Sequence, residues 1–91
     1  MDIKQCIAKK GLQIEVDTFK RWQSVDIDFI NSEGKEDEVQ FDLMNVGNKK
    51  GISVLSNLFA VFCKENGFKT NTVQSVTVVK SADSFEGLEV N

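Results

Sequence analysis

Six acidic residues stand at alternate positions in three short segments of this 91-residue chain. In the first segment, residues 12–17, apolar side chains alternate with Gln13, Glu15 and Asp17. Successive side chains of a strand point to opposite faces of its sheet, so this alternation predicts strands with one apolar and one acidic face. The predicted acidic face comprises Glu15, Asp17, Asp26, Asp28, Glu38 and Asp42.

Carboxylates gathered in this way could bind a cationic partner. Like charges directly opposite each other destabilise neighbouring strands, and a negative potential suits a basic protein groove or a site that otherwise holds nucleic acid. Ile30 and Met44 stand at alternate positions with the acidic residues, so their side chains are predicted to lie on the same face. An apolar residue within a charged ring is typical of a contact patch. The alternative is an ordinary solvated face that discourages aggregation at the sheet edges.

A second group of residues could bind an anion. Lys49 and Lys50 stand where a helix is predicted to begin, and the N–H groups of a helix N-terminus attract phosphate. Around Trp22, the single Trp of the chain, further cations could help to stack a nucleic-acid base. These cations are Lys9, Lys10, Lys20 and Arg21. The alternatives are a solvated loop before the helix and a Trp half-buried in the core.

Catalytic and metal-binding residue sets are missing from the sequence. The chain has no His, which excludes imidazole acid–base catalysis, His-activated nucleophiles and His ligation of metals. Cys6 and Cys63 are expected to be reduced thiols that pack as small apolar residues. Asp26 and Asp28 are followed by Ile30, which cannot supply the third oxygen of a calcium loop. We therefore predict no enzymatic activity, no metal site and no cofactor.

Hydrophobic periodicity predicts the elements that position these residues. A period of two predicts strands at about 12–18, 24–31 and 38–44. The period then changes to 3.6, which predicts a long amphipathic helix at about 49–66. A β-rich run at about 72–79 predicts a fourth strand. The apolar stripe of the long helix consists of Ile52, Leu55, Leu58, Phe59, Phe62 and Cys63.

Together these elements predict an α+β fold that forms a two-layer sandwich. A short helix begins after an Asp2 cap and stops at Gly11. The first three strands form an antiparallel meander, because their connections are short, and the long helix covers its apolar face. The fourth strand either joins an edge of that sheet or flanks the helix. Residues 1–91 form a single domain, with a polar, mobile tail at 81–91.

The predicted order of elements resembles that of the double-stranded-RNA-binding domain. The resemblance covers roughly residues 2–66 and consists of a helix, three strands and a second helix that opens with Lys49 and Lys50. It implies binding of nucleic acid through that helix N-terminus. The alanine-rich second helix of the family is replaced here by bulkier residues, and a strand follows it. Those bulkier residues are Leu55, Leu58, Phe59 and Phe62.

The sequence thus predicts a small, non-catalytic binding module. No run approaches the roughly 18 apolar residues of a membrane span, and residues 1–5 lack the apolar core of a signal peptide, so we expect a cytoplasmic protein without membrane contact. The expected partner is another protein with a basic surface, in an accessory or inhibitor role of the kind that small bacterial or phage proteins have. Nucleic acid is the alternative partner, and the oligomeric state stays open.

Overall fold

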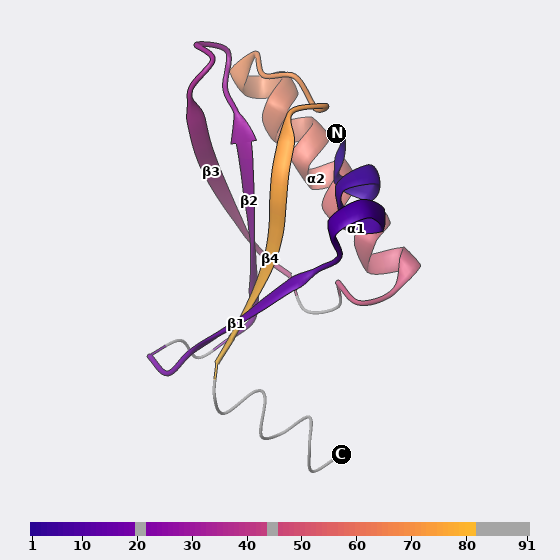
Figure 1. The fold of residues 1–91 in the computed structure, drawn as a ribbon, viewed down its shortest axis with the longest axis vertical. Coiled ribbons are helices and arrows are strands. Elements are labelled where there is room, and N and C mark those ends of the chain that lie inside the picture. The colour runs from indigo at the N-terminus through magenta and orange to yellow at the C-terminus, as the bar shows by residue number, and fades with distance from the viewer. Residues whose placement is uncertain (20–21, 44–45, 82–91) are drawn as a thin grey trace.

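A computed structural model describes residues 1–19, 22–43 and 46–81 (Figure 1). The predicted α+β class is confirmed, with a short N-terminal helix, a long helix and four strands in one sheet. The predicted positions Lys20, Arg21 and Met44, and the tail from residue 82 onward, lie outside the described residues. Along the chain the elements are α1 (Ile3–Lys10), β1 (Gln13–Asp17), β2 (Ser24–Ile30), β3 (Glu36–Asp42), α2 (Lys49–Asn66) and β4 (Val73–Ser81).

The predicted meander of strands one to three is wrong in one pairing. The strand order in the sheet is β1-β4-β2-β3, so β4 lies between β1 and β2 (Figure 1). β4 pairs in parallel with β1 and antiparallel with β2, while β2 and β3 form the predicted antiparallel hairpin. β4 has buried valines on both of its faces, which is the pattern of a central strand. They are Val73, Val76, Val78 and Val79.

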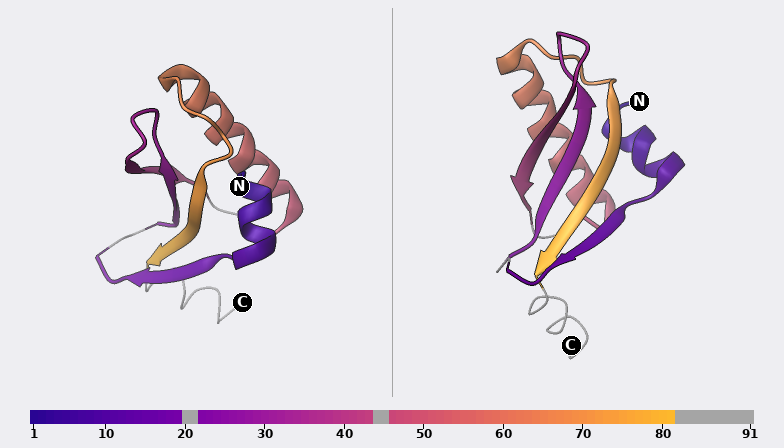
Figure 2. Two further views of the ribbon diagram at one scale, coloured as in Figure 1. Left: turned by 45° about the horizontal axis from the view of Figure 1, so that its top comes forward. Right: turned by 60° about the vertical axis from the view of Figure 1, so that its left-hand side comes forward.

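β1 also differs from the prediction, because its apolar side chains are not covered. Ile14 is 62% exposed and Val16 is 50% exposed, while Leu12 is partly buried. β1 is the edge strand next to β4, and it runs clear of α2 (Figure 2, left). The helix covers the part of the sheet formed by β2, β3 and β4, so β1 lies beyond the core.

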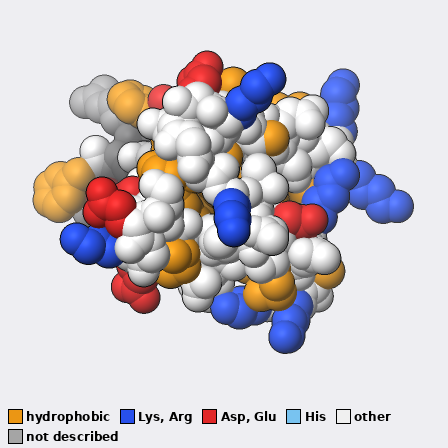
Figure 3. All heavy atoms as spheres, turned by 90° about the horizontal axis from the view of Figure 1, so that it is seen from above, with side chains coloured by type: hydrophobic (Ala, Val, Ile, Leu, Met, Phe, Trp, Pro, Cys, Tyr) orange, Lys and Arg blue, Asp and Glu red, His pale blue; other side chains and the backbone are white. Residues whose placement is uncertain are grey.

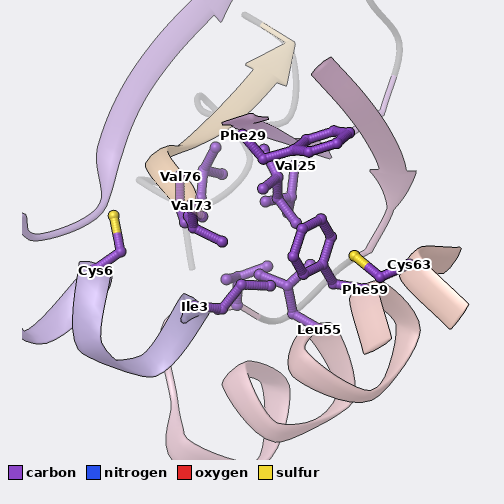
Figure 4. Close-up of a cluster of buried hydrophobic side chains, with 12 residues drawn as sticks. Ile3, Cys6, Val25, Phe29, Leu55, Phe59, Cys63, Val73 and Val76 are labelled. Atoms are coloured by element: carbon purple, nitrogen blue, oxygen red, sulfur yellow. The ribbon is translucent and has the colours of Figure 1, made fainter. Parts of the chain in front are cut away.

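The core lies between α1, α2 and the covered face of the sheet (Figure 4). Phe59 of α2 is buried and meets Phe29 of β2 edge-on, with ring centroids 5.6 Å apart at 71°. Such aromatic pairs stabilise a core beyond the area that they bury. Cys6 and Cys63 are both buried free thiols at separate places in this cluster, and burial raises the pKa of the Cys63 thiol.

Local capping fixes the two ends of α2, and the predicted bounds 49–66 match the observed helix. Asn48 is the N-cap, because its side-chain oxygen accepts a hydrogen bond of 2.8 Å from the Gly51 N–H. Gly67 follows the last turn in the left-handed conformation, with φ 71° and ψ 27°. The Phe68 N–H then donates to the Cys63 carbonyl at 2.8 Å, which completes a Schellman motif.

Candidate functional site

The acidic face predicted from the alternation is brought together on the side of the sheet opposite α2. Residues in register on neighbouring strands share a face, and Glu15 stands in line with Val79, Ser24 and Asp42 across all four strands. Asp28 lies directly opposite Glu38 on the neighbouring strand. The parity of each strand places all six predicted residues on this side: Glu15, Asp17, Asp26, Asp28, Glu38 and Asp42.

One further carboxylate belongs to this face and was missed by the sequence analysis. β3 begins at Glu36, two residues before its predicted start, so Glu36 lies on the sheet and not in the hairpin loop. Glu36 pairs with Ile30, which is partly buried on the same face. The sequence pattern could have identified Glu36, because polar residues at Glu36, Glu38 and Gln40 continue the strand alternation toward the N-terminus. We call these seven carboxylates the acidic face.

The carboxylates of the acidic face influence one another. The pKa of Glu38 is raised, first because neighbouring groups remove part of its hydration and then by repulsion from Asp26, Asp28 and Glu15. Glu15 belongs to β1, and two strands separate β1 from β3 in the sheet order. Figure 2 (left) shows β1 crossing below β4 at an angle to the rest of the sheet, so the sheet is not flat.

A hollow of about 510 Å³ lies on this side, at the end of the sheet next to the β2–β3 hairpin. Within it, Asp28 Oδ2 accepts a hydrogen bond of 2.7 Å from the Ser75 hydroxyl, which fixes that carboxylate against β4. Acidic side chains thus make up four of the seven residues that line the hollow. Its lining residues are Asp28, Phe29, Glu36, Asp37, Glu38, Gln74 and Ser75.

Most carboxylates of the acidic face form no ion pair with a Lys or Arg of the described residues. Among these residues one ion pair is found, between Lys35 Nζ and Glu33 Oε2 at 3.8 Å, and it lies in the hairpin loop. Glu15, Glu38 and Asp42 are exposed and have no described cation beside them. Residues 1–19, 22–43 and 46–81 contain no group of three acidic or thiol side chains close enough to hold a metal ion.

The basic residues predicted to bind an anion are only partly placed. Lys49 and Lys50 are exposed in the first turn of α2, which contains no acidic residue. Trp22 is 55% exposed, whereas its neighbours Lys20 and Arg21 lie outside the described residues. Lys10 is engaged elsewhere, since its Nζ donates to the Gln74 carbonyl at 2.8 Å and ties α1 to the start of β4.

Among residues 1–19, 22–43 and 46–81, apolar side chains reach the surface in two groups. One group lies on β1 and just after it, and Phe19, at 95% exposure, is its most exposed member; the others are Ile14, Val16 and Trp22. The second group is a stripe on α2 formed by Val54, Leu58 and Val61, which we call the α2 stripe. Leu58 was predicted to be part of the buried stripe, but it is 38% exposed because the buried stripe is centred on Leu55, Phe59 and Cys63. Figure 3 shows apolar side chains reaching the surface between projecting Lys side chains at the end of the molecule where α2 stops.

The protein shows neither a membrane-spanning helix among its described residues nor a detectable relative. No helix in the described part of the chain is long and apolar enough to cross a membrane. The similarity to the double-stranded-RNA-binding domain ends at the order of elements, because β4 separates β1 from β2 in the sheet. Neither protein-family models nor curated proteins nor solved structures gave a match to this chain.

Proposed function

We propose that this protein is a small, non-catalytic, cytoplasmic binding module that contacts a basic partner protein through the acidic face. The observation that carries the proposal is the gathering of seven carboxylates on the one sheet face that α2 leaves uncovered. An accessory or inhibitor role suits such a surface, since it can occupy a basic groove on another protein.

Electrostatics supports this choice of surface. Desolvation is the largest cause of the raised pKa of Glu38, and repulsion from the neighbouring carboxylates Asp26, Asp28 and Glu15 raises it further. A cationic partner would relieve the repulsion on binding, so the face would cost the isolated protein some stability and favour the complex. The negative potential would also speed association with a basic partner at low ionic strength.

A capture experiment with two matched double variants tests the proposal. Glu15→Gln with Glu38→Gln removes two charges from the acidic face, and Glu33→Gln with Glu65→Gln removes two exposed charges elsewhere. The immobilised parent, face variant and control variant are incubated with nuclease-treated extract of the source cell at low salt. We expect a basic protein that the parent and the control capture and the face variant loses. Equal capture by all three forms would contradict the proposal.

Nucleic acid is the competing outcome of the same experiment. Lys49 and Lys50 are exposed at the N-terminus of α2 without an acidic residue in that turn. If the parent captures a partner from untreated extract but not from nuclease-treated extract, binding to labelled RNA and DNA is measured against salt. Micromolar, salt-sensitive affinity that Lys49→Glu with Lys50→Glu abolishes would replace the proposed function by nucleic-acid binding.

A further inference from the structure

The outer edge of β3 carries a row of backbone groups that no described strand pairs with. β3 stands at the end of the strand order, and its other edge pairs with β2. In Figure 1 no described helix or strand lies beside this edge. An unpaired strand edge is a template for the addition of another strand.

The hairpin identifies which backbone groups point outward. Hydrogen-bonded and non-hydrogen-bonded pairs alternate along an antiparallel ladder. The Asn31 N–H donates to the Lys35 carbonyl at 2.9 Å, so every second residue of β3 from Lys35 onward is hydrogen-bonded to β2. The Ile30 N–H, which points the other way, donates to the Thr72 carbonyl at 3.2 Å on the β4 side, in agreement with this phase. The outward backbone groups of β3 are therefore those of Glu36, Glu38, Gln40 and Asp42.

One of these outward donors is already engaged locally. Asp37 Oδ1 accepts a hydrogen bond of 2.8 Å from the Glu38 N–H. An added strand would have to displace the Asp37 carboxylate to reach the Glu38 N–H. The outward groups of Gln40 and Asp42 are not engaged by this carboxylate. The half of β3 that contains Gln40 and Asp42 is thus the part best suited to pairing.

An apolar surface lies beside this edge on the face that α2 covers. Phe62 of α2 meets Phe41 of β3 with ring centroids 6.3 Å apart, which places this flank of the helix next to β3. Leu58 precedes Phe62 by one turn, and residues four apart lie on the same side of a helix. Leu58 and Val54, which are 38% and 40% exposed, therefore continue the side of α2 that carries Phe62 as an exposed apolar surface.

The side chains on the two faces of the sheet at β3 specify the residue types that an added strand would need. Side chains of an added strand on the acidic face would lie beside Glu36, Glu38 and Asp42, where Lys or Arg is favoured. Side chains on the other face would pack against Phe41 and Leu58, where apolar residues are favoured. A second copy of β3 would oppose these carboxylates with its own, and the like charges would disfavour self-pairing.

We propose that the outer edge of β3 binds an extended segment of a partner protein as a fifth strand, in which Lys or Arg alternates with apolar residues. This inference rests on the proposed function and specifies how the acidic face would engage a basic partner. Main-chain hydrogen bonds to Gln40 and Asp42 would supply affinity, and the alternation of the segment would supply specificity.

Two peptides of identical composition test the proposal. One is capped Lys-Val-Lys-Val-Lys-Val-Lys, and the other has the same residues in blocks, Lys-Lys-Lys-Lys-Val-Val-Val. Affinity is measured by titration calorimetry at low salt, and amide exchange is measured in the complex. We expect the alternating peptide to bind the parent at least tenfold more tightly than the block peptide and to slow exchange of the Gln40 and Asp42 amides.

Variants on opposite edges of the sheet provide the matched control. Leu58→Lys and Val54→Lys each replace an exposed apolar side chain on the side of α2 that carries Phe62, and Ile14→Lys replaces one on β1. The two α2 variants should weaken the alternating peptide at least tenfold, while Ile14→Lys should leave its affinity unchanged. Binding that both α2 variants retain would overturn the proposal.

The outcomes separate this inference from the proposed function. If both peptides bind equally and Glu15→Gln with Glu38→Gln abolishes both, the acidic face binds cations without strand addition, and only the further inference fails. If the alternating peptide does not bind at all, strand addition is likewise overturned. The capture experiment then decides the proposed function independently.

Discussion

Phe59 is the residue on which the packing of helix against sheet most depends. It is 1% exposed and contacts Phe29 and Phe62. Phe59→Ala should lower the free energy of unfolding by about 3–5 kcal/mol, because it removes buried surface and leaves a cavity. Since a small domain has only about 5–15 kcal/mol of stability, the variant should melt far below the parent.

Phe19→Ala is the matched control for this prediction, since Phe19 is 95% exposed. Circular dichroism melts of the two variants should differ strongly, with the Phe19→Ala variant close to the parent. If the Phe59→Ala variant melted at the same temperature as the parent, this would contradict the burial of the Phe59 side of α2 against the sheet.

Glu38 should make the stability of the protein depend on pH in a defined direction. Partial loss of hydration and the carboxylates of Asp26, Asp28 and Glu15 raise the pKa of Glu38 in the folded state. The unfolded chain releases this proton at lower pH than the folded chain, so folding stability falls as pH rises through the ordinary carboxyl range and beyond it. Glu38→Gln removes the charge and should raise Tm at pH 7 by about 1–3 °C.

The same substitution should have no effect at pH 3, where the Glu38 carboxyl is already protonated. Thermal melts at both pH values test this difference, with Glu65→Gln on the exposed surface of α2 as the control. An equal gain in Tm at pH 3 and pH 7 would show that charge repulsion is not the cause.

Helices and strand positions were predictable from the sequence, whereas the neighbours of each strand were not. The bounds of α2 follow from local signals, the Asn48 cap and Gly67, so periodicity and end residues identify the helix. β1 shows the same alternation as β2, yet Ile14 is 62% exposed and Ile27 is fully buried. Alternation fixes which face a side chain occupies, but pairing depends on which strands meet in space, and a strand 60 residues later in the chain occupies the place beside β1.

The C-terminal cap of α2 allows a test at the level of the element. Gly67 has a φ of 71°, and a Cβ added there meets no atom within 4 Å, so substitution costs backbone strain without a clash. Gly67→Ala should therefore destabilise the protein by about 1 kcal/mol. Gly47→Ala, also without a close neighbour and without a positive φ, should leave the denaturant midpoint nearly unchanged. Equal midpoints for the two variants would contradict the assigned cap.

At the scale of the whole molecule, the observed strand order predicts which strands lose their hydrogen bonds least often. β2 and β4 are central and largely buried, and β1 is an exposed edge strand. Amide exchange should therefore be slowest in β2 and β4 and fastest among the strands in β1. Exchange measured by NMR or mass spectrometry checks this order. Exchange in β4 as fast as in β1 would contradict the observed order, because the meander predicted from the sequence leaves the fourth strand at an edge of the sheet or outside it.

The membership of the acidic face was predictable because it depends only on parity within each strand. All six predicted carboxylates lie on one side of the sheet, although β1 has a different neighbour from the one expected. The repulsion that Glu15 exerts on Glu38, and the open edge of β3, depend on the complete sheet, so no local pattern encodes them. The role of this face in binding stays a prediction.

The parallel pairing of β1 with β4 has a consequence for biosynthesis. Asp17 is in register with Ser81, and at about 5–20 residues per second a ribosome needs about 3–13 s to pass from one to the other. During that interval the newly made β1 has no partner strand, with Ile14 and Val16 available to any other nascent chain. Glu15 and Asp17 interrupt this apolar pair with negative charge, as residues that guard aggregation-prone segments do. The acids of β1 would thus protect the chain on the ribosome before they serve any partner of the finished protein.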